Sequence, residues 1–320
     1  MILNCRPIAR APLFLAGLFL LFVAPLTAQT PLGGELRGQI VLDSAGVSGV
    51  DIELHRVTTA TSGVIDRTTS DASGRFTFRL PPIDTVGFTV FFATAEFNTV
   101  RYFGRPLHPS DDPGEYRLAV FDTTSAPDPP VRITRRDMVL LPQQDGSWEV
   151  NEIYTLLNPG RQTVVSGSGM PIVQLDIPEH AAAFEAGDGD TPADQVQRMG
   201  DRVLLLIPLL PGEREIFFRY RLPASPARAI LALRTMPDTM NLFVRQPAPS
   251  LTVDGLTPAE LIEVEGERFL QYTAGVGSPR SEITMRWQRG PSVSPVTAAV
   301  ALTIVVLIGG GVAAYRNRAS

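Results

Sequence analysis

The chain has 320 residues, 28 of them basic and 33 acidic, and its hydrophobic share of 44% is enough to build packed domains. Every basic residue is Arg, which excludes a lysine Schiff base and the lysine of a phosphate-binding loop. The net charge of −5 argues against nucleic-acid binding, because neutralising phosphates needs a basic surface.

The first 28 residues have the layout of a secretory signal peptide. Two arginines precede an apolar run over 11–26, and small residues close the segment. We place the cleavage after Ala28, with Ala24 as a second option and an uncleaved anchor as the alternative. The single cysteine, Cys5, leaves with this segment, so the sequence predicts no disulfide and no thiolate chemistry in the exported chain.

Residues 35–121 predict a first β-sandwich. Apolar and polar residues alternate there in short runs, the period of two that marks half-buried strands, and turn clusters of Gly, Asp, Ser and Pro separate them. The runs cover 36–42, 50–54, 76–80, 86–95, 99–103 and 116–121. Because no helical periodicity interrupts them, the pattern favours an all-β fold.

Three of these segments carry sequence patterns that also occur together in a known family. They read Leu-Arg-Gly-Gln-Ile-Val at 36–41, Gly-Val-Asp-Ile-Glu-Leu at 49–54 and Asp-Ala-Ser-Gly-Arg-Phe-Thr-Phe at 71–78. These patterns resemble those of the carboxypeptidase regulatory-like domain. Residues 91–95 depart from the Tyr-x-Leu-x-Val sequence that is usual in that family. The resemblance implies a compact, prealbumin-like or starch-binding-like β-sandwich over 35–120 with no catalytic residues of its own.

A Pro-rich linker over 122–131 leads into a second β-sandwich region over 132–289. Strand signals recur in this region, separated by Pro-Gly and Asn-Pro-Gly turns. One large sandwich or two small modules both fit its length. Only 257–261 and 227–231 suggest short helical turns.

Residues 295–315 form an uncharged apolar run, and about 20 such residues span a bilayer as one helix. With an exporting signal, this helix predicts a single-pass type I protein whose tail, 316–320, stays in the cytoplasm. A sorting tail removed by a processing enzyme is the alternative to a permanent anchor. Small residues four apart are candidate helix-packing positions, namely Gly309, Gly310, Ala313 and Ala314.

The histidines do not form a recognisable metal or catalytic motif. His55, His108 and His180 are far apart and show no His-x-x-x-His spacing, so we predict no metal and no cofactor. His55 is expected on a solvated outward strand face. Alternate aspartates in 188–194 hint at a calcium loop but lack its closing glutamate, so a solvated acidic loop is preferred.

Aromatic residues gather late in the first domain, and Phe91, Phe92, Tyr102 and Phe103 are candidate ligand contacts. Consecutive Phe91 and Phe92 place one ring on each face of a strand, so one of them is expected outside the core. Exposed rings of this kind stack against sugar rings. Contact with the neighbouring domain, or a plain surface residue, is the competing interpretation.

The sequence therefore predicts a non-enzymatic, membrane-anchored protein of the bacterial cell envelope. Its tandem β-sandwiches are expected in the periplasm or outside the cell, where they bind or scaffold an unidentified envelope protein or a glycan. A glycan-binding module is the first alternative. A hydrolase assembled at the domain interface, in which His108 or His180 meets a carboxylate cluster, is the second.

Overall fold

The computed structural model describes residues 34–81, 88–108, 115–125, 130–186, 195–274 and 281–288. The described residues form β-strands and contain no α-helix, and thus no helix long and apolar enough to cross a membrane. Several expectations lie outside these ranges: the signal peptide, the acidic segment 188–194, the apolar run 295–315, the tail 316–320 and the small residues Gly309, Gly310, Ala313 and Ala314.

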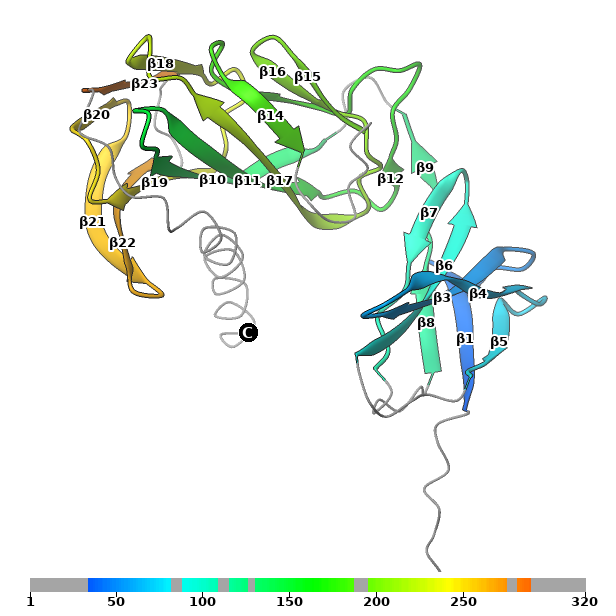
Figure 1. Ribbon diagram of the computed structural model, residues 1–320. Coiled ribbons are helices and arrows are strands. Elements are labelled where there is room, and N and C mark those ends of the chain that lie inside the picture. The colour runs from blue at the N-terminus through cyan, green and yellow to red at the C-terminus, as the bar shows by residue number, and fades with distance from the viewer. Residues whose placement is uncertain are drawn as a thin grey trace, which may run out of the picture.

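The first domain is built from two four-stranded sheets (Figure 1). One sheet has the order β2-β1-β5, with β8 parallel to β1; its strands are β1 (Glu35–Leu42), β2 (Ala45–Gly46), β5 (Arg75–Arg79) and β8 (Glu115–Ala119). The other has the order β4-β3-β6-β7; its strands are β3 (Asp51–Thr58), β4 (Ser62–Thr69), β6 (Thr89–Phe97) and β7 (Val100–Phe103). Apolar side chains of both sheets share one buried cluster, as in a sandwich.

Buried and exposed residues alternate along β1 and β5, and the buried ones contribute to this core. Close packing explains why the residue at the centre of β1 is a glycine. Phe76 and Phe78 point inward from β5, and Phe76 lies over β1. A Cβ on Gly38 would meet the Phe76 ring at 2.3 Å and the Tyr116 carbonyl oxygen at 2.7 Å. No larger side chain fits unless these neighbours shift.

The turn before β5 is held by Asp71. Its Oδ1 accepts hydrogen bonds from the backbone N–H groups of Ser73 and Arg75, both at 2.8 Å. Gly74 adopts a φ of +76°, a left-handed conformation that strongly favours glycine. The Asp-x-x-Gly sequence at 71–74 therefore sets the turn that places Phe76 and Phe78 on inward-facing positions of β5.

The second region is built on a seven-stranded sheet with the order β14-β17-β11-β10-β19-β22-β21 (Figure 1). Its strands are β10 (Arg132–Pro142), β11 (Trp148–Asn158), β14 (Ala182–Ala186), β17 (Gly212–Leu222), β19 (Thr239–Gln246), β21 (Thr257–Val264) and β22 (Glu267–Ala274). All neighbours pair antiparallel except β10 and β19, which run parallel.

Two three-stranded sheets pack on one face of this large sheet. The first has the order β13-β16-β15, from β13 (Val173–Asp176), β15 (Val196–Met199) and β16 (Arg202–Leu205). The second has the order β18-β23-β20, from β18 (Arg228–Ala232), β20 (Leu251–Asp254) and β23 (Glu282–Trp287). A single hydrophobic cluster includes buried residues of all three sheets. One core therefore extends through the described part of this region.

The opposite face of the large sheet buries a second apolar cluster, which explains why β10 does not alternate. Val139, Leu141, Ile153, Phe243 and Phe269 are at most 5% exposed and form this cluster. Residues of both parities along β10 are therefore buried. The second cluster is made of residues of the large sheet alone, because all its members lie on β10, β11, β19 and β22.

A buried ion pair lies inside the larger cluster. Arg136 of β10 donates two hydrogen bonds to the carboxylate of Glu152 on β11, at 2.8 and 2.9 Å, and both residues are at most 2% exposed. Arg136 also donates to the Asp176 carbonyl, and its guanidinium lies 4.9 Å from the centre of the Tyr154 ring. Tyr220 donates to Glu152. These partners satisfy the buried charges, and they connect β10 and β11 with β17 and with Asp176 at the end of the 173–176 strand.

The expectation of two short helical turns was wrong. The supposed helical turns at 257–261 and 227–231 lie in β21 and β18, because pairing with β22 and β23 outweighs local propensity. The expected linker also contains a short strand, β9 (Thr123–Thr124), which pairs parallel with β12 (Thr163–Val164) of the second region.

Candidate functional site

The four candidate aromatic residues divide between the core and the outer surface. Phe91 and Tyr102 are 1% and 0% exposed and point into the first core, so their candidacy as ligand contacts was wrong. Strand alternation turns their neighbours outward: Phe92 is half-buried and Phe103 is 57% exposed. Only Phe92 and Phe103 are therefore in a position to meet a ligand.

These two rings join His55 in an aromatic shelf, defined as His55, Phe92 and Phe103, on the outer face of β3, β6 and β7. His55 and Phe92 are register partners, and their rings stack with centroids 4.8 Å apart and planes 4° from parallel. The Phe92 and Phe103 centroids are 6.3 Å apart. Cross-strand register thus brings three residues together from three strands.

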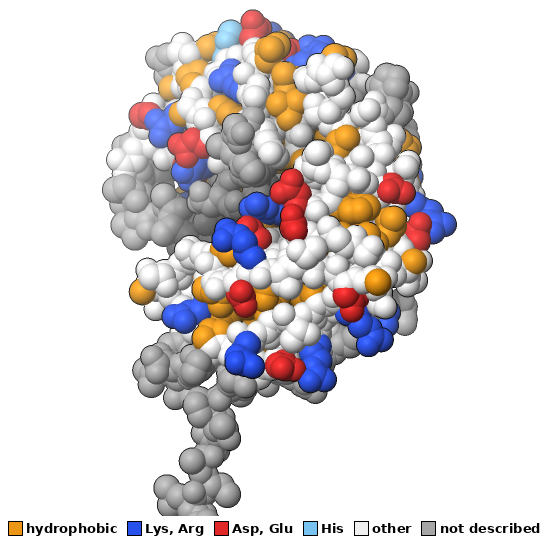
Figure 2. All heavy atoms as spheres, turned by 90° about the vertical axis from the view of Figure 1, so that its right-hand side faces the viewer, with side chains coloured by type: hydrophobic (Ala, Val, Ile, Leu, Met, Phe, Trp, Pro, Cys, Tyr) orange, Lys and Arg blue, Asp and Glu red, His pale blue; other side chains and the backbone are white. Residues whose placement is uncertain are grey.

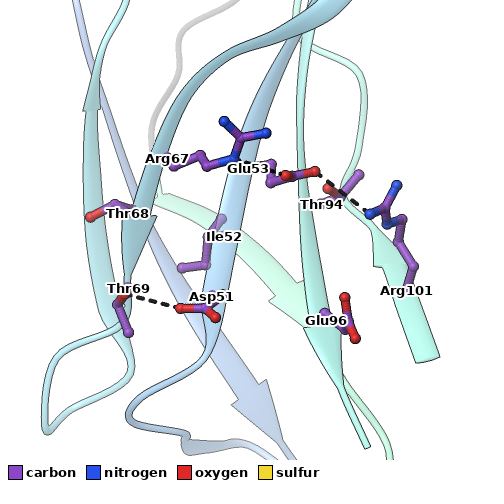
Figure 3. A pocket seen from close by; sticks show the side chains of 9 residues that line it. All are labelled: Asp51, Ile52, Glu53, Arg67, Thr68, Thr69, Thr94, Glu96 and Arg101. Atoms are coloured by element: carbon purple, nitrogen blue, oxygen red, sulfur yellow. Dashed lines mark hydrogen bonds and ion pairs between the residues drawn. The ribbon is translucent and has the colours of Figure 1, made fainter. Parts of the chain in front are cut away.

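A polar hollow of about 410 Å³ lies on the same sheet (Figure 3). It is lined by Asp51, Ile52, Glu53, Arg67, Thr68, Thr69, Thr94, Glu96 and Arg101. Its polar groups come from all four strands of the sheet, and most point outward because they occupy alternate strand positions. The hollow therefore offers carboxylates, guanidinium groups and hydroxyls to one ligand.

Glu53 links the arginines of this hollow. Its carboxylate accepts a hydrogen bond from Arg67 Nε at 3.0 Å and lies 3.7 Å from the guanidinium of Arg101 (Figure 3). At the other end of the hollow, Thr69 donates to Asp51 at 3.2 Å. The arginine side chains are more than half exposed, so these ion pairs fix side-chain direction more than they add stability.

His55 connects the hollow to the shelf. Its side chain is only 15% exposed, so the expectation of a solvated ring was wrong. Nε2 lies 3.1 Å from the hydroxyl of Thr94 and 3.6 Å from the carboxylate of Glu53. Burial lowers the pKa of His55 below 6.5, and the nearby Arg101 and Arg67 lower it further against the opposing effect of Glu53.

This arrangement is unsuited to nucleophilic catalysis. Both contacts of His55 use the same ring nitrogen, whereas a hydroxyl–imidazole–carboxylate relay needs one partner on each nitrogen. The hydroxyl of Thr94 also belongs to a residue that is 1% exposed, so a substrate has little access to it. Thr94 and Glu53 instead hold the His55 ring in its stack against Phe92.

The other two histidines lie elsewhere. His108 is exposed, and its ring meets the edge of Phe88 with centroids 6.1 Å apart. His180 lines a separate hollow of about 350 Å³ in the second region, together with Glu179 and Asp201. Among the described residues, no group of three His, Cys, Asp or Glu side chains is placed to hold a metal ion.

Charge of both signs is spread over the face of the molecule that Figure 2 draws. Figure 2 shows arginine and acidic side chains interspersed across the first domain, in the lower half of the view, with separate hydrophobic patches between them. Charged side chains here largely neutralise their neighbours, as around Glu53. Such a surface does not select strongly for a polyanion or a polycation.

The first domain's shelf and hollow were only partly visible in the sequence. Phe92 and Phe103 follow from strand alternation, but Glu53, Arg67 and Arg101 are ordinary charged residues until the register sets them side by side. The bulge between Leu54 and His55 adds an offset to the β3–β4 pairing that no sequence pattern indicates. The signal available was the outward parity of Glu53 and His55.

No protein-family model matches the chain, and its sequence matches no curated protein. Among solved structures, an aminopeptidase A of Legionella pneumophila in complex with aspartic acid is 14% identical with a TM-score of 0.34, over 52% of this chain and 22% of that one. An M1 zinc metallopeptidase of Deinococcus radiodurans is 13% identical with a TM-score of 0.29, over 49% of this chain and 42% of that one. The chain thus spans less than half the length of these neighbours, and a likeness this low carries no argument about activity.

Proposed function

We propose that the protein is a non-enzymatic binding protein of the bacterial cell envelope and that its first domain binds a glycan on the outer face of β3, β6 and β7. The observation that supports this proposal is the aromatic shelf of His55, Phe92 and Phe103 on the same face as the polar hollow. The resemblance of 35–120 to starch-binding-like sandwiches agrees with it.

The chemistry of the site suits a sugar. The C–H groups on one side of a pyranose ring pack against a flat aromatic surface, and its hydroxyls both donate and accept hydrogen bonds. Phe103 offers the most open ring of the shelf, and the hollow on the same sheet offers the acceptors and donors of Glu53, Arg67 and Thr69. A shallow site of this kind gives modest affinity, with a Kd of about 0.1–1 mM, or about −4 to −5.5 kcal/mol.

The cellular setting of the proposal rests on the two ends of the sequence. The signal-like segment 1–28 and the apolar run 295–315 support a location of the β domains outside the cytoplasm, on a single-pass type I anchor. In this position the first domain meets envelope polysaccharides. Scaffolding of another envelope protein is compatible with the same layout.

Binding to soluble polysaccharides tests the proposal. We expect the full chain to be retarded in native gels that contain a neutral glucan, a xylan or solubilised peptidoglycan, and to release no reducing sugar from them. Phe103→Ala should weaken binding to the polysaccharide that retards the wild type at least tenfold, because it removes the open ring of the shelf.

A matched control separates the shelf from general hydrophobicity. Leu261 is 55% exposed on β21 of the second region, so Leu261→Ala removes an equally exposed apolar side chain far along the chain. Its retardation should equal that of the wild type. Equal loss in both variants, no retardation by any polysaccharide, or hydrolysis that one substitution abolishes would each contradict the proposal.

A further inference from the structure

One edge of β18 lacks a neighbouring strand. β18 is the end strand of the sheet β18-β23-β20, so it pairs on one side only among the described residues. An open strand edge presents backbone N–H and C=O groups that are able to pair with another chain.

The hydrogen-bond register of β18 with β23 shows which backbone groups of β18 face the free edge. Trp287 donates its backbone N–H to the Ala227 carbonyl, and Leu233 donates to Ser281, so odd positions of this segment pair with β23. In an antiparallel pair, the alternate residues direct their backbone groups to the opposite side. Arg228, Ile230 and Ala232 therefore direct their N–H and C=O groups to the free edge, and no described residue bonds to these groups.

A hollow of about 350 Å³ adjoins this edge. Arg228, Ala229, Ile230 and Ala232 contribute its strand wall, and the chain that follows β13, from Ile177 to His180, contributes the facing wall together with Asp201. The free edge thus borders a cavity, with room for a further segment beside β18.

Ion pairs fix the facing wall. Arg234, just beyond β18, donates from its backbone N–H and its guanidinium to the Asp176 carboxylate, at 2.8 and 2.6 Å. The same guanidinium pairs with Asp201. Ile177 donates its backbone N–H to the Asp201 carbonyl. Both walls of the hollow are therefore tied to one arginine, which makes the site preformed.

We propose that this hollow binds an extended peptide segment of a partner protein, which adds as a strand to the free edge of β18. Three residues with outward backbone donors and acceptors at every second position complement the main chain of a strand, which has the same period. A sugar or small ion has no such row of paired groups. The hollow therefore extends the binding surface beyond the first domain and is independent of the glycan proposal.

The walls also define the side chains of the partner. Ala229 and Ile177 are buried and line the hollow, so inward-facing side chains of the added strand should be small and apolar. Ile230 is 41% exposed and favours a β-branched residue opposite to it. Arg228 favours an acidic or hydroxyl side chain at the next outward position.

Backbone-modified peptides test the inference on the full chain. The probe is fluorescein-labelled Val-Thr-Val-Thr-Val amide, compared with two isomers that are N-methylated at alternate residues, one at the even and one at the odd positions. Only one alternate set of the peptide's N–H groups faces β18. In fluorescence anisotropy, the isomer methylated at this set should therefore bind at least tenfold more weakly than the parent peptide, and the other isomer should bind with the parent's affinity. Equal binding by both isomers, or no binding by the parent peptide, would overturn the inference.

A protein variant locates the contact. Ile230→Pro removes an N–H group from the free edge and leaves the bonds to β23 in place, a position where strands tolerate proline. We expect at least a tenfold loss of peptide binding, whereas Ile230→Thr, which keeps the N–H group, should stay within about threefold of the wild type. Equal binding by both variants overturns the assignment to β18. If analytical ultracentrifugation shows a dimer that Ile230→Pro abolishes, the strand that pairs with β18 belongs to a second copy of this chain, and the proposal of a partner protein is overturned. If Ile230→Pro folds poorly, the comparison of the two N-methylated peptides decides the inference instead.

Discussion

At the scale of single residues, His55 has the most informative environment. Its ring is held between Phe92, Thr94 and Glu53, and this burial lowers its pKa below 6.5 while the unfolded chain keeps the ordinary value. The folded protein therefore carries a neutral ring where the unfolded chain begins to take up a proton. This difference ties stability to pH.

The predicted effect has a definite sign. As the pH falls below 6.5, the unfolded state binds the proton more readily, so the free energy of unfolding should decrease towards the lower pKa of the folded state. His55→Gln removes this titration and keeps a polar side chain beside Thr94. Thermal melting across pH 5–8 should show a shallower acid-side fall in Tm for the variant than for the wild type. Parallel curves would contradict the environment described for His55.

At the scale of elements, β1 depends on the lack of a side chain at its centre. Gly38 lies between the Phe76 ring and the Tyr116 backbone, whereas Gly63 on the edge strand β4 has nothing within 4 Å of its Cβ position. Both glycines are in strands, and neither has a positive φ. They therefore differ in packing alone.

Alanine substitutions at these two glycines give a matched pair. Gly38→Ala should destabilise the first domain by about 1–3 kcal/mol, because the added methyl overpacks the core. Gly63→Ala should change stability by less than about 1 kcal/mol, or raise it, because it restricts the unfolded chain. Urea denaturation of the full chain measures both. Equal losses would contradict the close approach at Gly38.

The elements also show what the sequence was able to predict. Strands with one buried face alternate cleanly, as in β1, β5 and β17, and their positions followed from that period. The exposed edge strand β4 does not alternate, nor does β10, whose residues are buried on both faces, because their burial depends on neighbours that are distant in sequence. The same reason hid Glu53 from the site, since its partners lie on β4 and β7.

At the scale of the whole molecule, the two regions meet through specific contacts. The Tyr102 hydroxyl lies 2.9 Å from the Thr163 hydroxyl, and β9 pairs with β12. Arg161 forms an ion pair with Asp43, and Val165 packs against the first core. Tyr102 was proposed as a ligand contact; its hydroxyl instead connects the first domain to the second region.

The proposed membrane layout gives a prediction for the full chain. In a Cys5→Ser background, a membrane-impermeant maleimide should label Ser48→Cys, an exposed position before β3, in intact spheroplasts. Ser320→Cys should react only after permeabilisation, because 316–320 is expected in the cytoplasm. Labelling of the two cysteines in the reverse pattern would exclude a type I orientation, and protection of both would exclude export.

The central claim is that the outer face of β3, β6 and β7 binds a glycan. Hydrogen–deuterium exchange of the full chain tests this claim most directly. It is measured with and without an oligosaccharide derived from the polysaccharide that retards the chain in native gels. We predict slower exchange in segments 51–55, 92–96 and 101–103, and no such change in the Phe103→Ala variant. Protection confined to the second region, or the same protection in Phe103→Ala, would contradict the account.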